Sequence, residues 1–382
     1  MPASVQRAPG LTREEVSPAS AADLRTGVPA ILVAAPLPGP LALGSPGQLT
    51  PALAALLSPP ALAALRGFFA CGGQRCHLIP VPGGAPELAL AAALAASEEA
   101  EDADLVIAPE LAVLHRYDAP GGEALLASQQ RRVLEHCERR ARFAILDAPM
   151  QAALRAEEHV EAVRRHAARL VGGPGSEHGA MYFPWLRPLR GDTSFVPPSG
   201  HVAGVYAATD AARGVHKAPA NEALRGASDL ELRVDAASQT GPLAAVNCIR
   251  PFPGRGLRIW GAHTLSGRAA TRHIGVRRLL LTLGRWLERR HSEFNFEPND
   301  PGLWSRILRV LHAELGELYR RGAFFGQTPQ DAYYVRCDEE TNPPELRAAG
   351  IVCAEIGVAP VMPRSFIVLR LSYTTQGITV TT

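Results

Sequence analysis

Lysine is almost absent from this 382-residue chain, since Lys217 is the only one and the other 38 of the 39 basic residues are arginines. The 39 basic and 37 acidic residues nearly cancel, which leaves a net charge of +2. A protein that binds nucleic acid by neutralising phosphates needs a larger positive excess. The charge balance therefore argues against nucleic acid as a partner.

Long apolar runs are also missing. No stretch of about 18 apolar residues occurs, so no transmembrane helix is predicted. The first residues, MPASVQRAPGLTREEV, lack the basic start and hydrophobic core of a signal peptide. We expect a cytoplasmic protein with no membrane partner.

The six cysteines are spread along the chain rather than grouped. Cys71, Cys76 and His77 lie close together, but no second CxxC or HxxxH completes a metal site, so small buried hydrophobic residues are the better interpretation. Nucleotide-binding and hydrolase motifs are missing as well. No GxGxxG follows the first apolar segment, the single lysine excludes a Walker motif, and GxSxG does not occur.

The first half of the chain alternates short apolar segments with helical patterns. Strands are predicted over residues 27–33, 76–81, 104–108, 143–147 and 179–183, and helices over 87–100, 124–142 and 150–170. Short apolar strands joined by helices of this length indicate a parallel sheet with right-handed crossovers.

The second half mixes helices and strands in a different order. Strands are predicted over 246–249, 257–261, 333–337, 351–358 and 366–371, and helices over 199–213, 274–291 and 301–321. In the helix over 274–291 the arginines Arg277, Arg278, Arg285 and Arg289 lie largely outside the apolar stripe. The predicted fold class is α/β and α+β. We divide it into an N-terminal arm (1–26), an α/β domain (27–195), a C-terminal domain (196–363) and a C-terminal arm and tail (364–382).

The stretch Phe195–Leu224 at first resembles an active site, because polar groups gather there among glycines and prolines. These groups are Ser199, His201, Asp210, His216, Lys217 and Asn221. Nucleophilic catalysis needs a base within hydrogen-bond reach of the nucleophile. His201 and Asp210 are over two turns apart on a predicted helix, and Ser199 is better explained as its N-cap.

We therefore interpret this stretch as a structural joint, with a hydrolase as the less favoured alternative. The joint consists of Ser199, Gly214, His216, Lys217 and Asn221. Lys217 suggests a position where a compact ammonium is wanted, at a loop or a subunit contact. A second candidate is the pair Glu110 and Asp147, which follow two predicted parallel strands and could form a paired-carboxylate site.

Several distinctive motifs follow one another along the chain. The first stretches are PGLTREEV, LRTGVPAILVAAPLPGP, RGFFACGGQRCHLIPV and RFAILDAP. They continue with VPPSGHVAGVYAATDAARGVHKAPANEALRG, FPGRGLRIWGAHTL, VRRLLLTL, FEPNDPGLW, YYVRCDEETNPP and IVCAEIGVAPVMPRSFIVLRL. In this order, from about Pro9 to Leu371, the stretches resemble the tail sheath proteins of contractile phage tails and related contractile injection systems.

The resemblance implies a structural subunit that is not an enzyme and uses no cofactor. Such subunits stack as hexameric rings around an inner tube and contract to drive the tube through a target envelope. The implied partners are other copies of the chain, an inner tube protein, baseplate and terminator proteins, and other sheath paralogues. The alternative within the same machine is a paralogue at the baseplate or terminal end. The implied location is a contractile particle assembled in the cytoplasm.

The resemblance also implies that terminal arms pair as strands with neighbouring subunits. The candidate arm residues are Gly10, Leu11, Thr12, Glu14, Glu15 and Val16 near the start, and Phe366, Ile367, Val368, Leu369, Arg370 and Leu371 near the end. An unpaired apolar strand such as RSFIVLRL would be prone to aggregate, so pairing with a neighbour would protect it. The alternative is that it is the last strand of its own sheet. If it is an arm, truncation after Pro363 should leave a folded monomer that forms no tubes.

Overall fold

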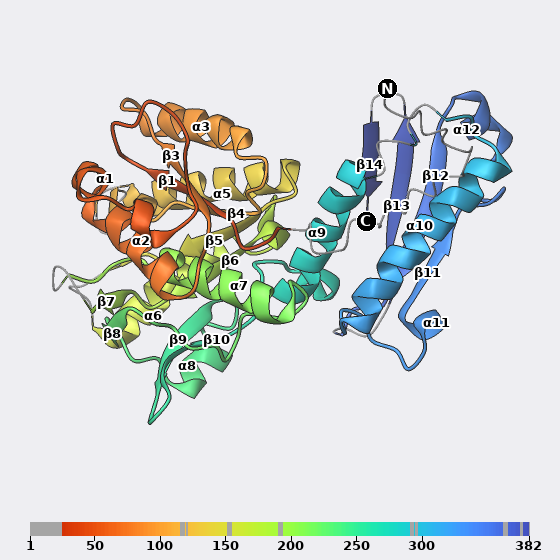
Figure 1. The fold of residues 1–382 in the computed structure, drawn as a ribbon. Coiled ribbons are helices and arrows are strands. Elements are labelled where there is room, and N and C mark those ends of the chain that lie inside the picture. Colours follow the sequence, from red (N-terminus) through yellow and green to blue (C-terminus); the bar gives the residue numbers. More distant parts are fainter. Residues whose placement is uncertain are drawn as a thin grey trace, which may run out of the picture.

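The computed structural model describes residues 25–114, 119, 121–150, 155–189, 194–290, 294, 297–361, 366–374 and 377–381. These residues form a large body around an eight-stranded sheet and a small body around a four-stranded sheet. Helix α9 (Ile274–Arg290) lies between the two bodies (Figure 1).

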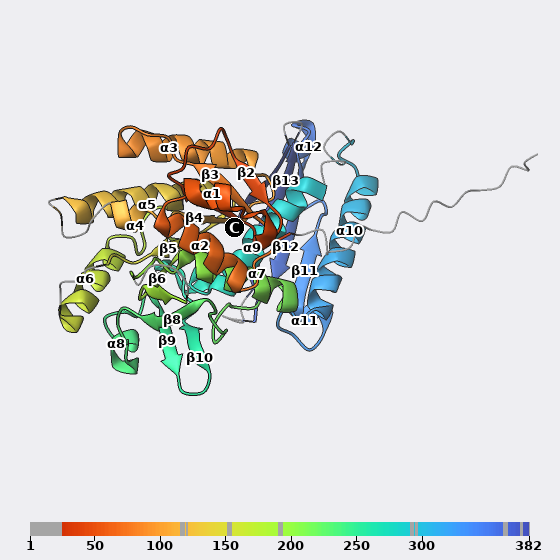
Figure 2. The ribbon, with the colours of Figure 1, turned by 60° about the vertical axis from the view of Figure 1, so that its left-hand side comes forward.

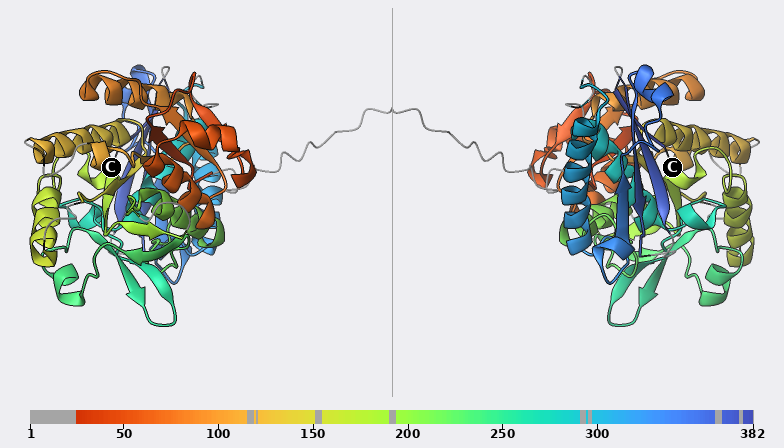
Figure 3. Two further views of the ribbon diagram at one scale, coloured as in Figure 1. Left: turned by 90° about the vertical axis from the view of Figure 1, so that its left-hand side faces the viewer. Right: turned by 90° about the vertical axis from the view of Figure 1, so that its right-hand side faces the viewer.

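The large sheet has the strand order β10-β9-β6-β5-β4-β1-β3-β2. Its parallel strands are β1 (Pro29–Val33), β3 (Cys76–Pro80), β4 (Leu105–Ile107), β5 (Phe143–Asp147), β6 (Gly179–Phe183) and β9 (Asn247–Phe252). Two antiparallel strands, β2 (Leu41–Leu43) and β10 (Gly256–Trp260), form the edges. This confirms the predicted parallel sheet, and the β9–β10 hairpin projects beyond it (Figure 3).

Helices cover both faces of the large sheet, which explains why its central strands are apolar throughout. One face packs on α1 (Pro51–Leu56), α2 (Pro59–Ala70) and α7 (Ser199–Arg213). The other packs on α3 (Pro86–Ala96), α5 (Gly122–Arg139) and α6 (Ala156–Ala168) (Figure 2). The remaining short elements of this body are α4 (Leu111–Leu114), β7 (Leu186–Pro188), β8 (Ala227–Leu230) and α8 (Ala236–Thr240).

The small body is an antiparallel sheet with helices on one face. Its order is β11 (Tyr333–Arg336), β12 (Val352–Val358), β13 (Ile367–Thr374) and β14 (Gly377–Thr381). Its core side chains come from these strands, from α9 and from α10 (Pro301–Arg320), while α11 (Pro329–Ala332) and α12 (Pro344–Ala348) are short. Strand β14 falls in the segment that the sequence suggested was a tail.

The division of the chain at residue 195 is corrected by the cores. Helix α7 and strands β9 and β10 follow that residue, yet their buried side chains belong to the core of the large body. The core changes only along α9, where Ile274 and Leu281 pack in the large body and Leu283 and Leu287 in the small one. A helix period cannot show which sheet a helix will cover, so the sequence alone misplaced this boundary.

Helices α2 and α7 pack unusually close because glycines line their contact. A Cβ on Gly200 would lie 2.3 Å from the Cα of Ala64, and one on Gly204 would lie 2.3 Å from the carbonyl oxygen of Phe68. From the other side, a Cβ on Gly67 would lie 2.3 Å from Nδ1 of His201. The glycines in SGHVAG therefore serve helix packing.

We predict that Gly204→Ala lowers the free energy of unfolding by about 1–3 kcal/mol, because the methyl group meets backbone that cannot move cheaply. Urea unfolding followed by circular dichroism measures the change. Gly83→Ala is the matched control, since a Cβ there has no neighbour within 4 Å. Equal stability of the two variants would contradict the close helix contact.

Candidate functional site

The stretch that resembled an active site forms α7 and the turn after it. The helix begins at Ser199 with Pro198 as N-cap, so the prediction that Ser199 caps it was wrong. The backbone N–H of Ser199 instead donates to Oδ1 of Asp147, 2.8 Å away, at the end of β5. A carboxylate 52 positions earlier in the chain therefore satisfies this helix start, as favoured at a helix N-terminus.

The two carboxylates predicted as a possible pair have separate structural roles. Glu110 accepts hydrogen bonds from the backbone N–H of Ala34 and the hydroxyl of Ser58. Asp147 binds Ser199, and burial raises the pKa of Asp147 to about 7. Glu110 follows β4 and Ala34 follows β1, at the place where the strand order reverses and doubly wound sheets bind ligands. Here Glu110 of the protein itself accepts the hydrogen bond from the backbone N–H of Ala34.

His201 and Asp210 do not form a catalytic pair. The His201 ring lies against Gly67, and burial lowers the pKa of His201 to about 4, so the ring is neutral at pH 7. Asp210 is held by Arg278, with oxygen–nitrogen distances of 2.8 and 2.5 Å. The Ser199 contact with Asp147 is made by the backbone N–H, and no histidine among the described residues contacts the Ser199 hydroxyl, so this stretch does not bring a nucleophile and a base together.

The predicted joint is an ordered turn that contacts three elements. Gly214 ends α7 with φ 86°, and its carbonyl accepts the N–H of Lys217 at 3.1 Å. Asn221, at φ 58°, donates its N–H to the carbonyl of Ile259 in β10 at 2.7 Å. A Cβ on Gly275 of α9 would lie 2.4 Å from the His216 carbonyl oxygen. A role of Lys217 at a subunit contact stays a prediction.

A buried polar group near the end of β6 was missed by sequence reasoning. Glu231 accepts the backbone N–H of Trp185 at 3.1 Å, and its other oxygen lies 3.1 Å from Nε2 of His159. Burial raises the pKa of Glu231 to about 8 and lowers the pKa of His159. Neither residue belongs to a motif, and their distance of 72 positions gives the sequence no signal for the pair.

The C-terminal arm residues lie in and beside a central strand of the small sheet. Strand β13 pairs with β12 from Ile367 to Tyr373 and with β14 from Arg370 to Thr374. Leu369 and Leu371 are buried in the core, whereas Phe366, Val368 and Arg370 are exposed. Within one chain, the strand therefore behaves as part of its own sheet. Its pairing with a neighbour stays a prediction, and Gly10–Val16 lies outside the described residues.

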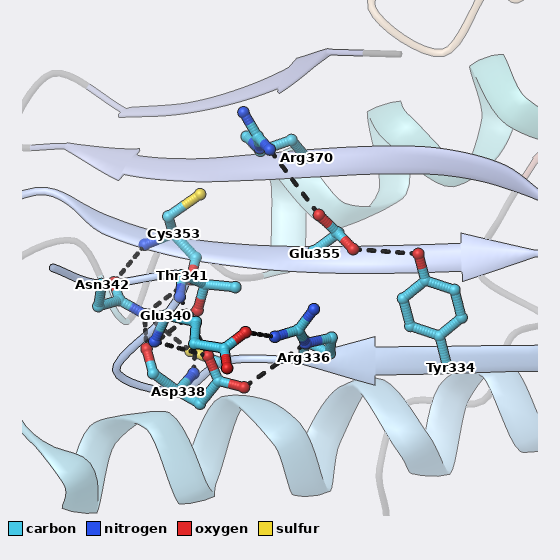
Figure 4. Close-up of polar contacts among 10 residues, drawn as sticks. Tyr334, Arg336, Asp338, Glu340, Thr341, Asn342, Cys353, Glu355 and Arg370 are labelled. Atoms are coloured by element: carbon cyan, nitrogen blue, oxygen red, sulfur yellow. Dashed lines mark hydrogen bonds and ion pairs between the residues drawn. The ribbon is translucent and has the colours of Figure 1, made fainter.

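The sheet face opposite the helices carries a row of polar groups (Figure 4). The Tyr334 hydroxyl donates to Glu355 at 3.0 Å, and Arg370 lies 3.8 Å from the other oxygen of Glu355. The Tyr334 ring crosses Gly357, where a Cβ would come within 2.0 Å of it. The three strands β11, β12 and β13 are thereby linked on this face by side chains.

Asn342 closes the turn after β11 by imitating a strand partner (Figure 4). Its side-chain oxygen accepts the N–H of Cys353 at 2.7 Å, and its nitrogen donates to the Cys353 carbonyl at 2.9 Å. Asn342 is fully buried. The turn itself is held by Asp338, whose carboxylate accepts the N–H groups of Glu340 and Thr341 at 3.0 Å each.

Among the described residues, no group of three or more His, Cys, Asp or Glu could hold a metal ion. No helix in the same part of the chain is long and apolar enough to cross a bilayer. The polar groups described above bind one another or the backbone. These polar groups thus stabilise the two joined bodies.

Comparison with known proteins specifies the class. Residues 83–265 match the family model of the phage tail sheath protein central domain. A search of curated proteins found no match.

Solved structures match along nearly the whole chain. A chain of the anti-feeding prophage baseplate is 27% identical, with a TM-score of 0.69 and coverage of 95% of this chain and 98% of that one. The contracted sheath complex of the extracellular contractile injection system PVC is 26% identical, with a TM-score of 0.71 and coverage of 96% and 97%. The sheath tail protein of Desulfitobacterium hafniense, 12% identical over 97% and 99% with a TM-score of 0.63, shares the fold.

The chain therefore carries a phage tail sheath central domain over residues 83–265, and along nearly its whole length it is similar to structural sheath proteins rather than to enzymes. This confirms the family that the motif order indicated. At the coarser level it is a sheath or baseplate-like component of a contractile injection system.

We predict that Asn342→Ala lowers the free energy of unfolding by roughly 2–4 kcal/mol, because the N–H and C=O groups of Cys353 lose their buried partner. Chemical unfolding measures the loss. Glu340→Ala in the same turn is the control, because its side chain is 79% exposed. Equal stability of the two variants would show that the contacts of Asn342 with Cys353 do not stabilise the small body.

A second prediction concerns pH. The folded state keeps a proton on Glu231 up to about pH 8, whereas an exposed glutamate releases it near about pH 4.3. The stability that comes from this protonation is full below pH 4.3 and is lost as the pH rises toward 8. Glu231→Gln stays neutral, so its unfolding free energy relative to the wild type should rise from pH 5 to pH 8.

Urea unfolding at pH 5, 6.5 and 8 checks this difference. The exposed Glu345→Gln serves as control and should follow the wild-type profile at every pH. Parallel profiles for Glu231→Gln and the wild type would show that this carboxyl group does not titrate in the interior.

Proposed function

We propose that the protein is the repeating subunit of a contractile sheath, which stacks as hexameric rings around an inner tube and contracts to drive the tube through a target envelope. The observation that carries this proposal is the similarity over nearly the full length to a chain of the contracted PVC sheath complex. A match to the contracted helical sheath of the anti-feeding prophage, 28% identical over 89% of this chain, supports it further.

The small sheet offers the means of polymerisation. Among the described residues, each outer strand, β11 and β14, has one edge without a partner strand. Unpaired edges provide main-chain donors and acceptors for a strand of another chain. The proposed donors are Gly10–Val16 and the C-terminal strand of neighbouring copies. Exchange of β13 between copies could preserve its pairing with β12, because identical chains supply identical partners.

The structure changes the expected result of C-terminal truncation. A chain that ends at Pro363 would lose Leu369, Leu371 and Tyr373, which are all buried in the core of the small body. Removal of several core side chains costs far more than a surface change. We now expect this truncation to unfold the small body, so absence of tubes would not by itself report on strand exchange.

The N-terminal arm allows a cleaner test. Deletion of residues 1–24 leaves every core side chain of the described residues in place, because the first of these core side chains is Val28. We predict an unchanged thermal unfolding midpoint but no rods in negative-stain electron microscopy. Deletion of residues 1–8 is the matched control, because it retains the proposed strand Gly10–Val16 and should form rods as the full chain does. Normal rods after the longer deletion would exclude the N-terminal strand from assembly.

A second candidate role is a paralogue at the baseplate. It is favoured by the match to the contracted anti-feeding prophage baseplate, 25% identical with a TM-score of 0.74 over 95% of this chain. The full-length protein expressed alone separates the two roles. Long rods indicate the repeating sheath subunit, whereas isolated rings or monomers that add only to a preformed baseplate indicate the paralogue.

A further inference from the structure

Helix α9 binds the two bodies through opposite kinds of surface. Toward the small body it presents apolar side chains, among them Leu280, Leu283 and Leu287. Toward the large body it presents arginines as well as Ile274 and Leu281. Two of these arginines, Arg277 and Arg278, are buried with exposed fractions of 6% and 2%. They lie outside the apolar stripe as predicted, yet they face protein.

Arg278 forms the centre of a buried ionic node. Its guanidinium binds both oxygens of Asp210 in α7, at 2.8 and 2.5 Å, and one oxygen of Asp104 just before β4, at 2.9 Å. It also lies over the ring of Tyr206, 4.8 Å from the centroid. Asp104 lies 174 positions before Arg278 in the chain, and Asp210 lies 68 positions before it.

The same two carboxylates hold the residues where the N-terminal segment joins the large body. The second oxygen of Asp104 accepts the backbone N–H of Val28 at 2.7 Å. Asp210 also forms a hydrogen bond with the side chain of Thr26. Each carboxylate therefore contacts Arg278 on one side and the stretch Thr26–Val28 on the other.

We propose that the node of Arg278, Asp104 and Asp210 couples the base of the N-terminal segment directly to α9 and the small body. Arg278 is the positioning residue, because a planar fork of donors can bind two carboxylates at once. This inference rests on the proposed function in one respect. If the N-terminal segment links neighbouring subunits, tension on it enters at Thr26–Val28 and passes through the node into α9.

The neighbouring Arg277 provides a matched comparison. It is buried on the same helix, 2.9 Å from Glu177 and 2.5 Å from Nε2 of His178. None of its contacts reaches residues 26–28. Removal of either arginine leaves buried groups without a cation, but only removal of Arg278 should release the N-terminal stretch.

The test is hydrogen–deuterium exchange with mass spectrometry on full-length subunits separated from rods by centrifugation. In Arg278→Met, we expect amides of residues 25–33 and of α9 to exchange at least about tenfold faster together, because opening of the node exposes both. In Arg277→Met, α9 exchanges faster but residues 25–33 do not. Faster exchange of α9 alone in Arg278→Met, or identical patterns in the two variants, would overturn the coupling.

Arg278→Lys keeps the comparison decisive if Arg278→Met does not fold. A lysine retains the charge but cannot form the forked contact with two carboxylates, so the same paired increase is expected on a smaller scale. Unchanged exchange in residues 25–33 of this variant would also overturn the proposal.

The exchange result is independent of assembly. If the wild-type protein forms no rods but the exchange of both segments is coupled, the proposed function fails and the node stands. If the wild type forms rods and the exchange is not coupled, only the node fails.

Discussion

The arrangement of this protein depends on how α9 satisfies two bodies at once. One side of the helix is apolar and completes the core of the small sheet, while the other carries arginines into the interior of the large body. Burial of a guanidinium is tolerated only when carboxylates meet it with good geometry, and removal of one partner from such a pair typically costs 3–5 kcal/mol. The placement of α9 relative to the large sheet is therefore tied to Asp104 and Asp210.

The large body shows how a fold associated with ligand binding can serve as a scaffold. Its parallel strands reverse order at β1 and β4, which is the usual position of a ligand crevice. Glu110 binds the backbone N–H that follows β1, and Asp147 binds the first N–H of α7. Both carboxylates are thereby committed to internal contacts. Similar folds host unrelated functions, and here the site residues stabilise the body itself.

The small body combines a stable core with edges suited to pairing. Its strands are joined on the face away from the helices by Tyr334, Glu355 and Arg370, and Asn342 satisfies the backbone of β12 where β11 ends. These contacts keep the sheet ordered within one chain. In the part of the chain that the structure describes, the outer edges of β11 and β14 have no strand partner, so their main-chain donors and acceptors are open to pairing.

The sequence by itself determined the local structure and, through the order of its motifs, the resemblance to tail sheath proteins. The parallel strands, the helices between them and the amphipathic α9 follow from apolar periodicity, which depends only on neighbouring residues. Three features required the tertiary structure. They are the boundary between the cores along α9, the roles of Asp147 and Glu231, and the contacts of Arg278. Each joins positions far apart in the chain, and a charged residue looks the same in sequence whether it faces water or a buried partner. Only the packing of distant elements decides between those two environments.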